Sequence, residues 1–305
     1  MELGEGFART PSKTRTKLAP HIYIDTSFYL SQYPIDRFRL RALAHGVASR
    51  GVLVGLSAAA ALNLPISSTT KKIQFAGTCT RSFKETENRY RIINGTLDIA
   101  TPIGSAETTD YLSTCIDVTR WEGIVEGLII TDYCLSREAF SIEELRDEVH
   151  DCQHFSGSSI LRELAALACP GSQSPQESIL KYNLCDVVLD CGVSLGAQPE
   201  LTVPGQPHTY ASDLWIPEVG LLIEYDGQGK YSDTATQTTS SVILAELNRQ
   251  KLLESLGFTF FRVTGDVVKN TDYLDHIRNL ILMMQQYPRP FHSELAGGGF
   301  AIIEA

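Results

Sequence analysis

Several familiar signals are missing from this sequence, and each absence excludes a class of protein. No apolar run is long enough to span a bilayer, and residues 1–17 lack the apolar stretch of a signal peptide. The 7 cysteines include no C-x-x-C pair, so we expect reduced thiols and neither a disulfide framework nor a zinc site. The chain also has no Walker or Rossmann glycine pattern, no nucleophile elbow and no internal repeat. These absences predict a cytoplasmic protein with no membrane partner.

Charge is unevenly distributed along the chain. Of the 305 residues, 43% are hydrophobic and 20% are charged, as in an ordinary globular protein, and the formal net charge is −10. Residues 1–91 hold 14 Lys or Arg against 6 Asp or Glu, a charge of +8, whereas the remainder holds 12 against 30, a charge of −18. The basic first third is compatible with a nucleic-acid partner, and the acidic remainder with metal ions. A solvated basic tail is the alternative.

A segment rich in Gly, Pro and Ser at residues 169–175 (CPGSQSP) predicts a domain boundary. The length of the chain suits two domains. We therefore expect a loose basic arm at 1–20, an N-terminal domain at 21–168, a C-terminal domain at 169–290 and a tail at 291–305.

The N-terminal domain is expected to be mostly helical with short strands. Apolar spacing predicts helices over 33–51, 109–136 (in two pieces), 141–153 and 158–168, and strands over 21–25, 71–77 and 89–95. Ser57 is expected to cap a short Ala-rich helix, and Ser141 with Glu144 has the spacing of a capping box.

The C-terminal domain alternates helices with strands. Helices are expected over 174–187, 242–257 and 270–287, the first with Ser174 as its cap and Pro175 at its first position. Strands are expected over 201–205, 208–216, 219–227 and 258–264. The pattern predicts the α/β class, as a mixed α+β arrangement in which helices flank a mixed sheet.

One apolar strand of this domain ends in acidic residues. In LLIEYDGQGKY (221–231), Glu224 and Asp226 lie two positions apart and share one face of the strand. A short hairpin through 214–220 brings Asp213 beside Glu224. Three carboxylates converging at a sheet edge suit Mg²⁺ or Mn²⁺, which can activate water and orient a phosphodiester. Lys230 can then offset developing negative charge.

These pieces, followed by AELNRQKLLESLGFTFFRVT, resemble the very-short-patch-repair-like (Vsr-like) branch of the PD-(D/E)XK nuclease superfamily over about residues 171–270. The resemblance implies a restriction-endonuclease-like core that cleaves DNA with Mg²⁺ or Mn²⁺. Asp213 matches the first metal-binding aspartate, Glu224 the acid of the (D/E)-x-K element, and Glu177 an acid of the preceding helix. The later helix and strand imply phosphate-contacting or bracing roles for a basic set: Arg249, Lys251 and Arg262.

The chain departs from the superfamily pattern where the motif lysine belongs. That position holds Asp226, in the E-x-D-G form common in this branch. Lys230 is the nearest substitute for the lysine, and Asp226 is a candidate further metal ligand.

The first half resembles AbiEi-type antitoxin or regulator proteins, through RGVLVGLSAAAALNLPI (50–66) and TCIDVTRWEGIVEGLIITDYCLS (114–136). Members of that group are often fused to such a nuclease-like domain. The basic residues Arg37, Arg39 and Arg41 of this half are expected to contact nucleic acid.

The leading expectation is a metal-dependent endonuclease that acts on DNA. A homodimer and a defence-system or toxin–antitoxin partner are both compatible with this expectation. Two alternatives stay open: a DNA-binding regulator with a degenerate nuclease fold, and a protein-interaction module of a defence system. Simpler interpretations of single residues also stand. Glu224 and Asp226 are then exposed strand-end acids, Glu177 stabilises a helix start, Lys230 lies on the surface, and Arg249 and Lys251 pair with Glu246 or Glu254 on their own helix.

Overall fold

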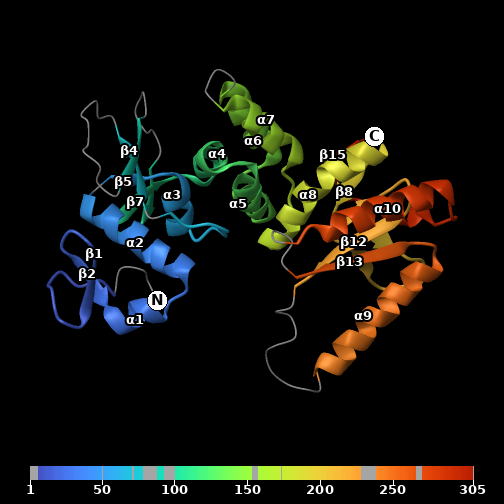
Figure 1. The fold of residues 1–305 in the computed structure, drawn as a ribbon, viewed down its shortest axis with the longest axis horizontal. Helices are drawn as coiled ribbons and strands as arrows, with labels where there is room; N and C mark the ends of the chain where they lie inside the picture. The colour runs from blue at the N-terminus through green and yellow to red at the C-terminus, as the bar shows by residue number, and fades with distance from the viewer. Residues whose placement is uncertain are drawn as a thin grey trace. The chain divides into compact units, whose positions relative to one another are not determined.

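The chain divides into two compact units, Met1–Ala165 and Ala166–Ala305. A computed structural model describes residues 6–49, 51–70, 72–77, 88–92, 100–152, 157–172, 174–227, 238–265 and 270–304. Both units combine helices with strands (Figure 1), which confirms the predicted mixed α/β class. The expected boundary at 169–175 lies a few residues after this division. In the described ranges, no helix is long and apolar enough to cross a membrane.

The N-terminal unit contains a two-stranded sheet, β1-β2, and a five-stranded sheet of order β5-β4-β3-β7-β6. The pairs β3–β7 and β4–β5 are parallel, and the other pairs are antiparallel. Its elements are β1 (Arg15–Ala19), β2 (Ile22–Asp25), α1 (Thr26–Ser31), α2 (Pro34–Ser49), β3 (Val52–Leu53), α3 (Gly55–Ala61), β4 (Ile73–Gly77), β5 (Asn88–Ile92), β6 (Ala100–Ile103), β7 (Ala106–Thr109), α4 (Tyr111–Glu122), α5 (Ile124–Ser136), α6 (Ile142–Asp151) and α7 (Ser158–Leu167), which extends across the division.

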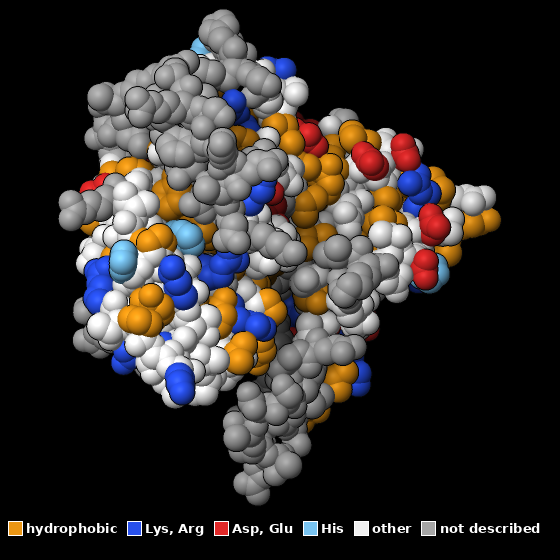
Figure 2. All heavy atoms as spheres, turned by 60° about the vertical axis from the view of Figure 1, so that its left-hand side comes forward, with side chains coloured by type: hydrophobic (Ala, Val, Ile, Leu, Met, Phe, Trp, Pro, Cys, Tyr) orange, Lys and Arg blue, Asp and Glu red, His pale blue; other side chains and the backbone are white. Residues whose placement is uncertain are grey.

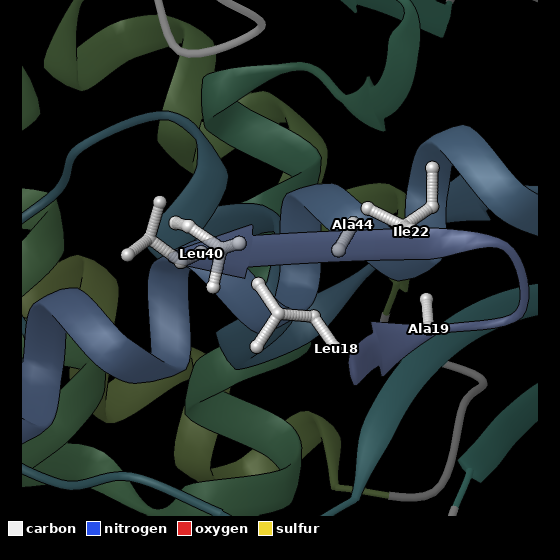
Figure 3. Close-up of a cluster of buried hydrophobic side chains, with 6 residues drawn as sticks. Leu18, Ala19, Ile22, Leu40 and Ala44 are labelled. Carbon is white, nitrogen blue, oxygen red and sulfur yellow. The ribbon is translucent and has the colours of Figure 1, made fainter. Parts of the chain in front are cut away.

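The segment expected to be a loose arm instead forms part of this unit. Residues 15–19 form β1, which pairs with β2 because the hairpin can then bury apolar side chains against α2. Figure 3 shows Leu18, Ala19 and Ile22 from the hairpin beside Leu40 and Ala44 from α2. Each of these side chains is at most 9% exposed.

The predicted helix cap at Ser57 is wrong. Helix α3 begins two residues earlier, at Gly55, and Ser57 is fully buried, where its hydroxyl accepts a hydrogen bond from the backbone N–H of Gln74 at 2.9 Å. Gly55 permits this start because its φ of +56° favours glycine, and a Cβ there would lie 2.6 Å from Oε1 of Gln74 and 2.7 Å from the ring of Trp121. The Ser57 hydroxyl, which the sequence assigns to a helix cap, therefore bonds to the backbone of β4 instead.

Other local expectations hold. The apolar stretch at 109–136 forms two helices, α4 and α5, which meet at Gly123 with φ +103°. Ser141 and Glu144 form the predicted capping box at the start of α6. Ser174 caps α8, and Pro175 occupies the first position of that helix.

The C-terminal unit is built on a five-stranded mixed sheet of order β13-β12-β11-β8-β15, with a smaller sheet of order β10-β9-β14. Only the β12–β13 pair is parallel among the described pairs of this unit. Its elements are α8 (Pro175–Cys191), β8 (Leu195–Ala197), β9 (Glu200–Thr202), β10 (Thr209–Ala211), β11 (Leu214–Ile216), β12 (Leu221–Asp226), α9 (Thr238–Ser255), β13 (Thr259–Thr264), α10 (Asp272–Gln286), a 3-10 turn (Ser293–Leu295), β14 (Ala296–Gly297) and β15 (Phe300–Ile303).

Helices cover both faces of the larger sheet. Figure 1 shows α9 on one side of β12 and β13, with α8 and α10 on the other. Leu222 of β12 and Leu253 of α9 belong to one buried cluster, so α9 packs on the face of β12 that also carries Glu224.

The residues expected to form a tail complete the C-terminal unit. Strand β14 is the edge strand of the smaller sheet, and β15 is an edge strand of the larger one. The ring of Phe291 packs edge-on against that of Phe258, with the ring centroids 5.6 Å apart. The unit therefore extends past residue 290, because the last strands have apolar neighbours and unpaired sheet edges to join.

Candidate active site

The acidic site is organised by the β11–β12 hairpin, which confirms the hairpin predicted from the sequence. Leu214 pairs with Ile223 in antiparallel register, so Asp213 stands opposite Glu224, one residue before β11 begins. One carboxylate oxygen of Asp213 accepts a hydrogen bond from the backbone N–H of Tyr225 at 2.8 Å. Glu224 thus lies on β12 and Asp213 directly before the neighbouring strand β11, so the expected pairing of the two acids extends one residue beyond the strand.

Two arginines hold the carboxylate of Glu224. Nη2 of Arg249 lies 2.6 Å from Oε1, and Nη2 of Arg262 lies 3.3 Å from Oε2. Arg249 comes from α9, whereas Arg262 lies directly beside Glu224 in the parallel register of β12 and β13. The Glu224 side chain is only 13% exposed, so its charge needs such partners.

Glu246 of α9 is shared by the same arginines. Its Oε1 lies 2.6 Å from Nη2 of both Arg249 and Arg262. The contact between Arg249 and Glu246 bears out the simpler interpretation of this helix, but Arg249 reaches Glu224 as well. Arg249 is further fixed by donating to the backbone carbonyl of Ala211 at 2.9 Å.

Burial and the arginines act on the pKa values of the site in opposite directions. Burial raises the pKa of Glu224, and the hydrogen bond and charge of Arg249, with the charge of Arg262, offset this only in part. Burial also acts to raise the pKa of Glu246, but the same two arginines outweigh it and lower that pKa. Glu224 is therefore a desolvated carboxylate that depends on its neighbours for its charge.

The third acid, Asp226, ends β12 on the same face as Glu224 and is half-buried. Between them, the hydroxyl of Tyr225 donates to the carbonyl of Gly265 at 2.7 Å and fixes the strand end. Lys230 lies outside the described residues, so its predicted role stays a prediction.

The expected convergence of three carboxylates is not present in the described part of the chain. There, no three His, Cys, Asp or Glu side chains gather closely enough to hold a metal ion. The physical reason is that both oxygens of Glu224 contact guanidinium groups, while one oxygen of Asp213 binds a backbone N–H.

The chemistry of the donors still suits a divalent ion. At this end of the sheet lie two arginines and four carboxylates, those of Asp213, Glu224, Asp226 and Glu246. Four negative and two positive charges leave a formal charge of −2, which Mg²⁺ or Mn²⁺ would neutralise, and both ions prefer carboxylate oxygens. Coordination by Glu224 requires Arg249 to release Oε1.

Glu177 lies at the start of α8 and is 9% exposed. Its carboxylate accepts a hydrogen bond from the hydroxyl of Ser174 at 2.9 Å, and its backbone N–H donates to the same hydroxyl at 3.4 Å. These contacts fit the helix-stabilising interpretation of Glu177, and its catalytic role stays a prediction.

Sequence reasoning missed the fully buried lysine of this unit. Lys181 follows Glu177 by one helical turn, is 1% exposed, and its Nζ donates to Sγ of Cys169 at 3.3 Å. The available signal was the apolar neighbours Leu180, Leu184 and Cys185, of which the last two lie one helical turn after Lys181 on the same face.

The remaining basic residues are dispersed. Lys251 is exposed on α9. On α2 of the N-terminal unit, Arg37 and Arg41 lie one turn apart and share a face of the helix, whereas Arg39 between them is turned to another side. Arg39 donates to Oδ1 of Asn63, and burial lowers its pKa.

No protein-family model and no curated protein matches this chain. The residues and contacts of the chain itself are therefore the basis for its function.

Proposed function

We propose that the C-terminal unit is a metal-dependent endonuclease of the PD-(D/E)XK type, close to its Vsr-like branch, which hydrolyses phosphodiester bonds in DNA. The observation that carries the proposal is the position of Asp213 directly before β11, where the register of β11 with β12, extended by one residue, puts it opposite Glu224. Asp226 follows two residues later on the same face of β12. A mixed sheet with helices on both faces positions these acids at the end of a parallel strand pair.

Each residue has a role in this proposal. Asp213, Glu224 and Asp226 would hold the Mg²⁺ or Mn²⁺ ion, which would supply positive charge to polarise the phosphodiester and stabilise its leaving oxygen. Arg249 turns from Glu224 to a phosphate oxygen, where its planar guanidinium forms charge-assisted hydrogen bonds.

The other site residues support these. Arg262 stays beside Glu224 and orients its carboxylate, and Glu177 is auxiliary. Lys251, exposed on the same helix as Arg249, contacts the DNA backbone. Lys230 supports the transition state.

A second candidate is a DNA-binding regulator whose nuclease fold does not cleave. The contacts of Glu224 favour it, because the two arginines already neutralise the carboxylate that would hold the ion. In the nuclease a divalent ion binds at Glu224, whereas in the regulator the two arginines remain the partners of that carboxylate.

Plasmid cleavage with Mg²⁺ or Mn²⁺ tests the proposal. Wild type is compared with Asp213→Ala, Glu224→Ala and a matched control, Asp186→Ala, which removes an exposed acid of α8. Mn²⁺ binding is measured on the same proteins by calorimetry. We expect wild type and Asp186→Ala to nick or linearise DNA, and both site variants to lose at least about 100-fold in rate, as when one preorganised charge-stabilising group is removed.

Three outcomes are decisive. Loss of both cleavage and Mn²⁺ binding in folded site variants supports the nuclease. A wild type that binds DNA but neither cleaves it nor binds Mn²⁺ overturns the nuclease in favour of the regulator. Cleavage that survives both substitutions places the chemistry elsewhere and overturns the assignment of the site.

A further inference from the structure

The N-terminal unit contains a basic pocket far in sequence from the acidic site. Its volume is about 490 Å³, and its lining includes Lys17, Arg41, His45 and Lys72, with Tyr29 and Leu18 as its apolar part. No Asp or Glu belongs to this lining. Figure 2 shows several Lys, Arg and His side chains in the lower left part of the view, where few acidic side chains are visible.

The fold brings these basic residues together from three separate segments of the chain. Lys17 belongs to β1, Arg41 and His45 lie one turn apart on α2 and so share a face of it, and Lys72 directly precedes β4. Helix α2 contacts both β1 and β4. In the buried cluster of Figure 3, Leu18 of β1 packs with Leu40 and Ala44 of α2, so the two elements that line the pocket share a hydrophobic core.

Two acids that lie near these residues in the sequence, Asp25 and Asp36, interact with other groups. The carboxylate of Asp25 caps α1 by accepting from the backbone N–H of Phe28 at 2.9 Å and from the hydroxyl of Ser27 at 2.6 Å. Asp36 acts on Arg39, which does not line the pocket. The positive formal charges of Lys17, Arg41 and Lys72 line one concave surface, and such a surface favours the binding of an anion.

We propose that this pocket binds a phosphate group of a nucleotide. A phosphate monoester carries close to two negative charges near neutral pH and offers three acceptor oxygens, which three converging cations can satisfy. The volume lies within the range of small-ligand sites, which extends well beyond a single inorganic ion. The ring of Tyr29 and the side chain of Leu18 supply an apolar wall for the remainder of the nucleotide.

The same chemistry is offered by a free nucleotide and by the phosphates of a nucleic acid, and the experiment distinguishes these sources. The proposal goes beyond the endonuclease, because it requires neither the metal nor cleavage. It also assigns Lys17, His45 and Lys72, which the sequence does not single out.

Binding is tested on the full chain, without divalent ions, by fluorescence anisotropy of a labelled single-stranded oligonucleotide and by calorimetry with AMP. The variants are Lys17→Gln, Lys72→Gln and their combination. Both lysines are exposed, so their replacement leaves the core intact. Lys13→Gln and Arg9→Gln remove exposed cations of the same segment that do not line the pocket and serve as matched controls.

We expect each single pocket variant to weaken binding about tenfold, as when a charge-assisted hydrogen bond to phosphate is lost, the combination to weaken it further, and each control to change it by less than about twofold. The dependence on salt should also fall by about one unit of slope per lysine removed. AMP binding that is lost in the pocket variants identifies a free nucleotide, whereas loss confined to the oligonucleotide identifies nucleic-acid phosphates. Wild type that binds neither probe, or pocket variants that bind like the controls, overturns the proposal.

Discussion

At the scale of single residues, the contact between Arg249 and Glu224 has a measurable effect on stability. Both side chains are nearly buried, at 15% and 13% exposure, so removing the guanidinium leaves Glu224 with Arg262 alone, 3.3 Å away. We predict that Arg249→Gln lowers the free energy of unfolding of the C-terminal unit by about 2 kcal/mol, because a desolvated charge loses its closest partner.

Urea denaturation measures this change selectively. The chain has 2 tryptophans, one in each unit, so a Trp121→Phe background leaves Trp215 as the reporter of the C-terminal unit. The matched control is Arg278→Gln, which breaks the exposed pair with Asp190 and should change the stability much less, because solvent screens that pair. Equal losses in both variants would show that the Glu224 pair is no stronger than a surface salt bridge.

The acids of the site were easier to predict than their partners. The pairing of Asp213 with Glu224 follows from a short hairpin and a two-residue strand period, both of which are local features. The contact with Arg249 joins positions 25 residues apart through α9, and it depends on which face of that helix packs on β12. That face is set by the burial of residues such as Leu253. A local sequence pattern does not predict tertiary packing of this kind.

At the scale of elements, the sequence signals that hold are those satisfied within one helical turn. Ser141 and Ser174 cap α6 and α8 as predicted, since each hydroxyl finds a backbone N–H three residues ahead. Ser57 fails as a cap because its hydroxyl bonds to the backbone of β4, which lies 17 residues away in sequence. A capping rule based on local sequence includes only a backbone N–H within the same helix, and not a partner on a distant strand.

We predict that Ser174→Ala lowers the free energy of unfolding of the C-terminal unit by about 1 kcal/mol, the usual cost of losing a serine cap. The same Trp215 reporter measures it. Ser255→Ala, which removes an exposed serine at the end of α9, is the control and should change stability by less than about 0.5 kcal/mol. Matching values for the two variants would mean that the cap adds nothing to α8, and that Glu177 has no helix-start role through Ser174.

At the scale of the whole molecule, the two units differ strongly in charge. Residues 1–165 hold 18 Lys or Arg against 20 Asp or Glu, a formal charge of −2, whereas residues 166–305 hold 8 against 16, a charge of −8. The basic side chains of the first unit are concentrated in residues 1–91, which include the proposed phosphate pocket. The unit proposed to cleave DNA is therefore the one that DNA repels more strongly.

This contrast predicts that the N-terminal unit supplies most of the affinity for DNA. Each unit has its own buried cluster, and the segment 168–174 between α7 and α8 contains no charged residue, so the chain can be divided there without altering either charge. We expect the C-terminal fragment to bind a DNA duplex at least about tenfold more weakly than the full chain at about 0.15 M salt, because cation contacts with phosphate dominate such binding. The N-terminal fragment should keep most of the affinity and its steep dependence on salt. Fluorescence anisotropy measures both the affinity and its dependence on salt. Circular dichroism with a cooperative thermal transition checks that each fragment is folded. Equal affinity of the C-terminal fragment and the full chain would assign DNA binding to the acidic unit.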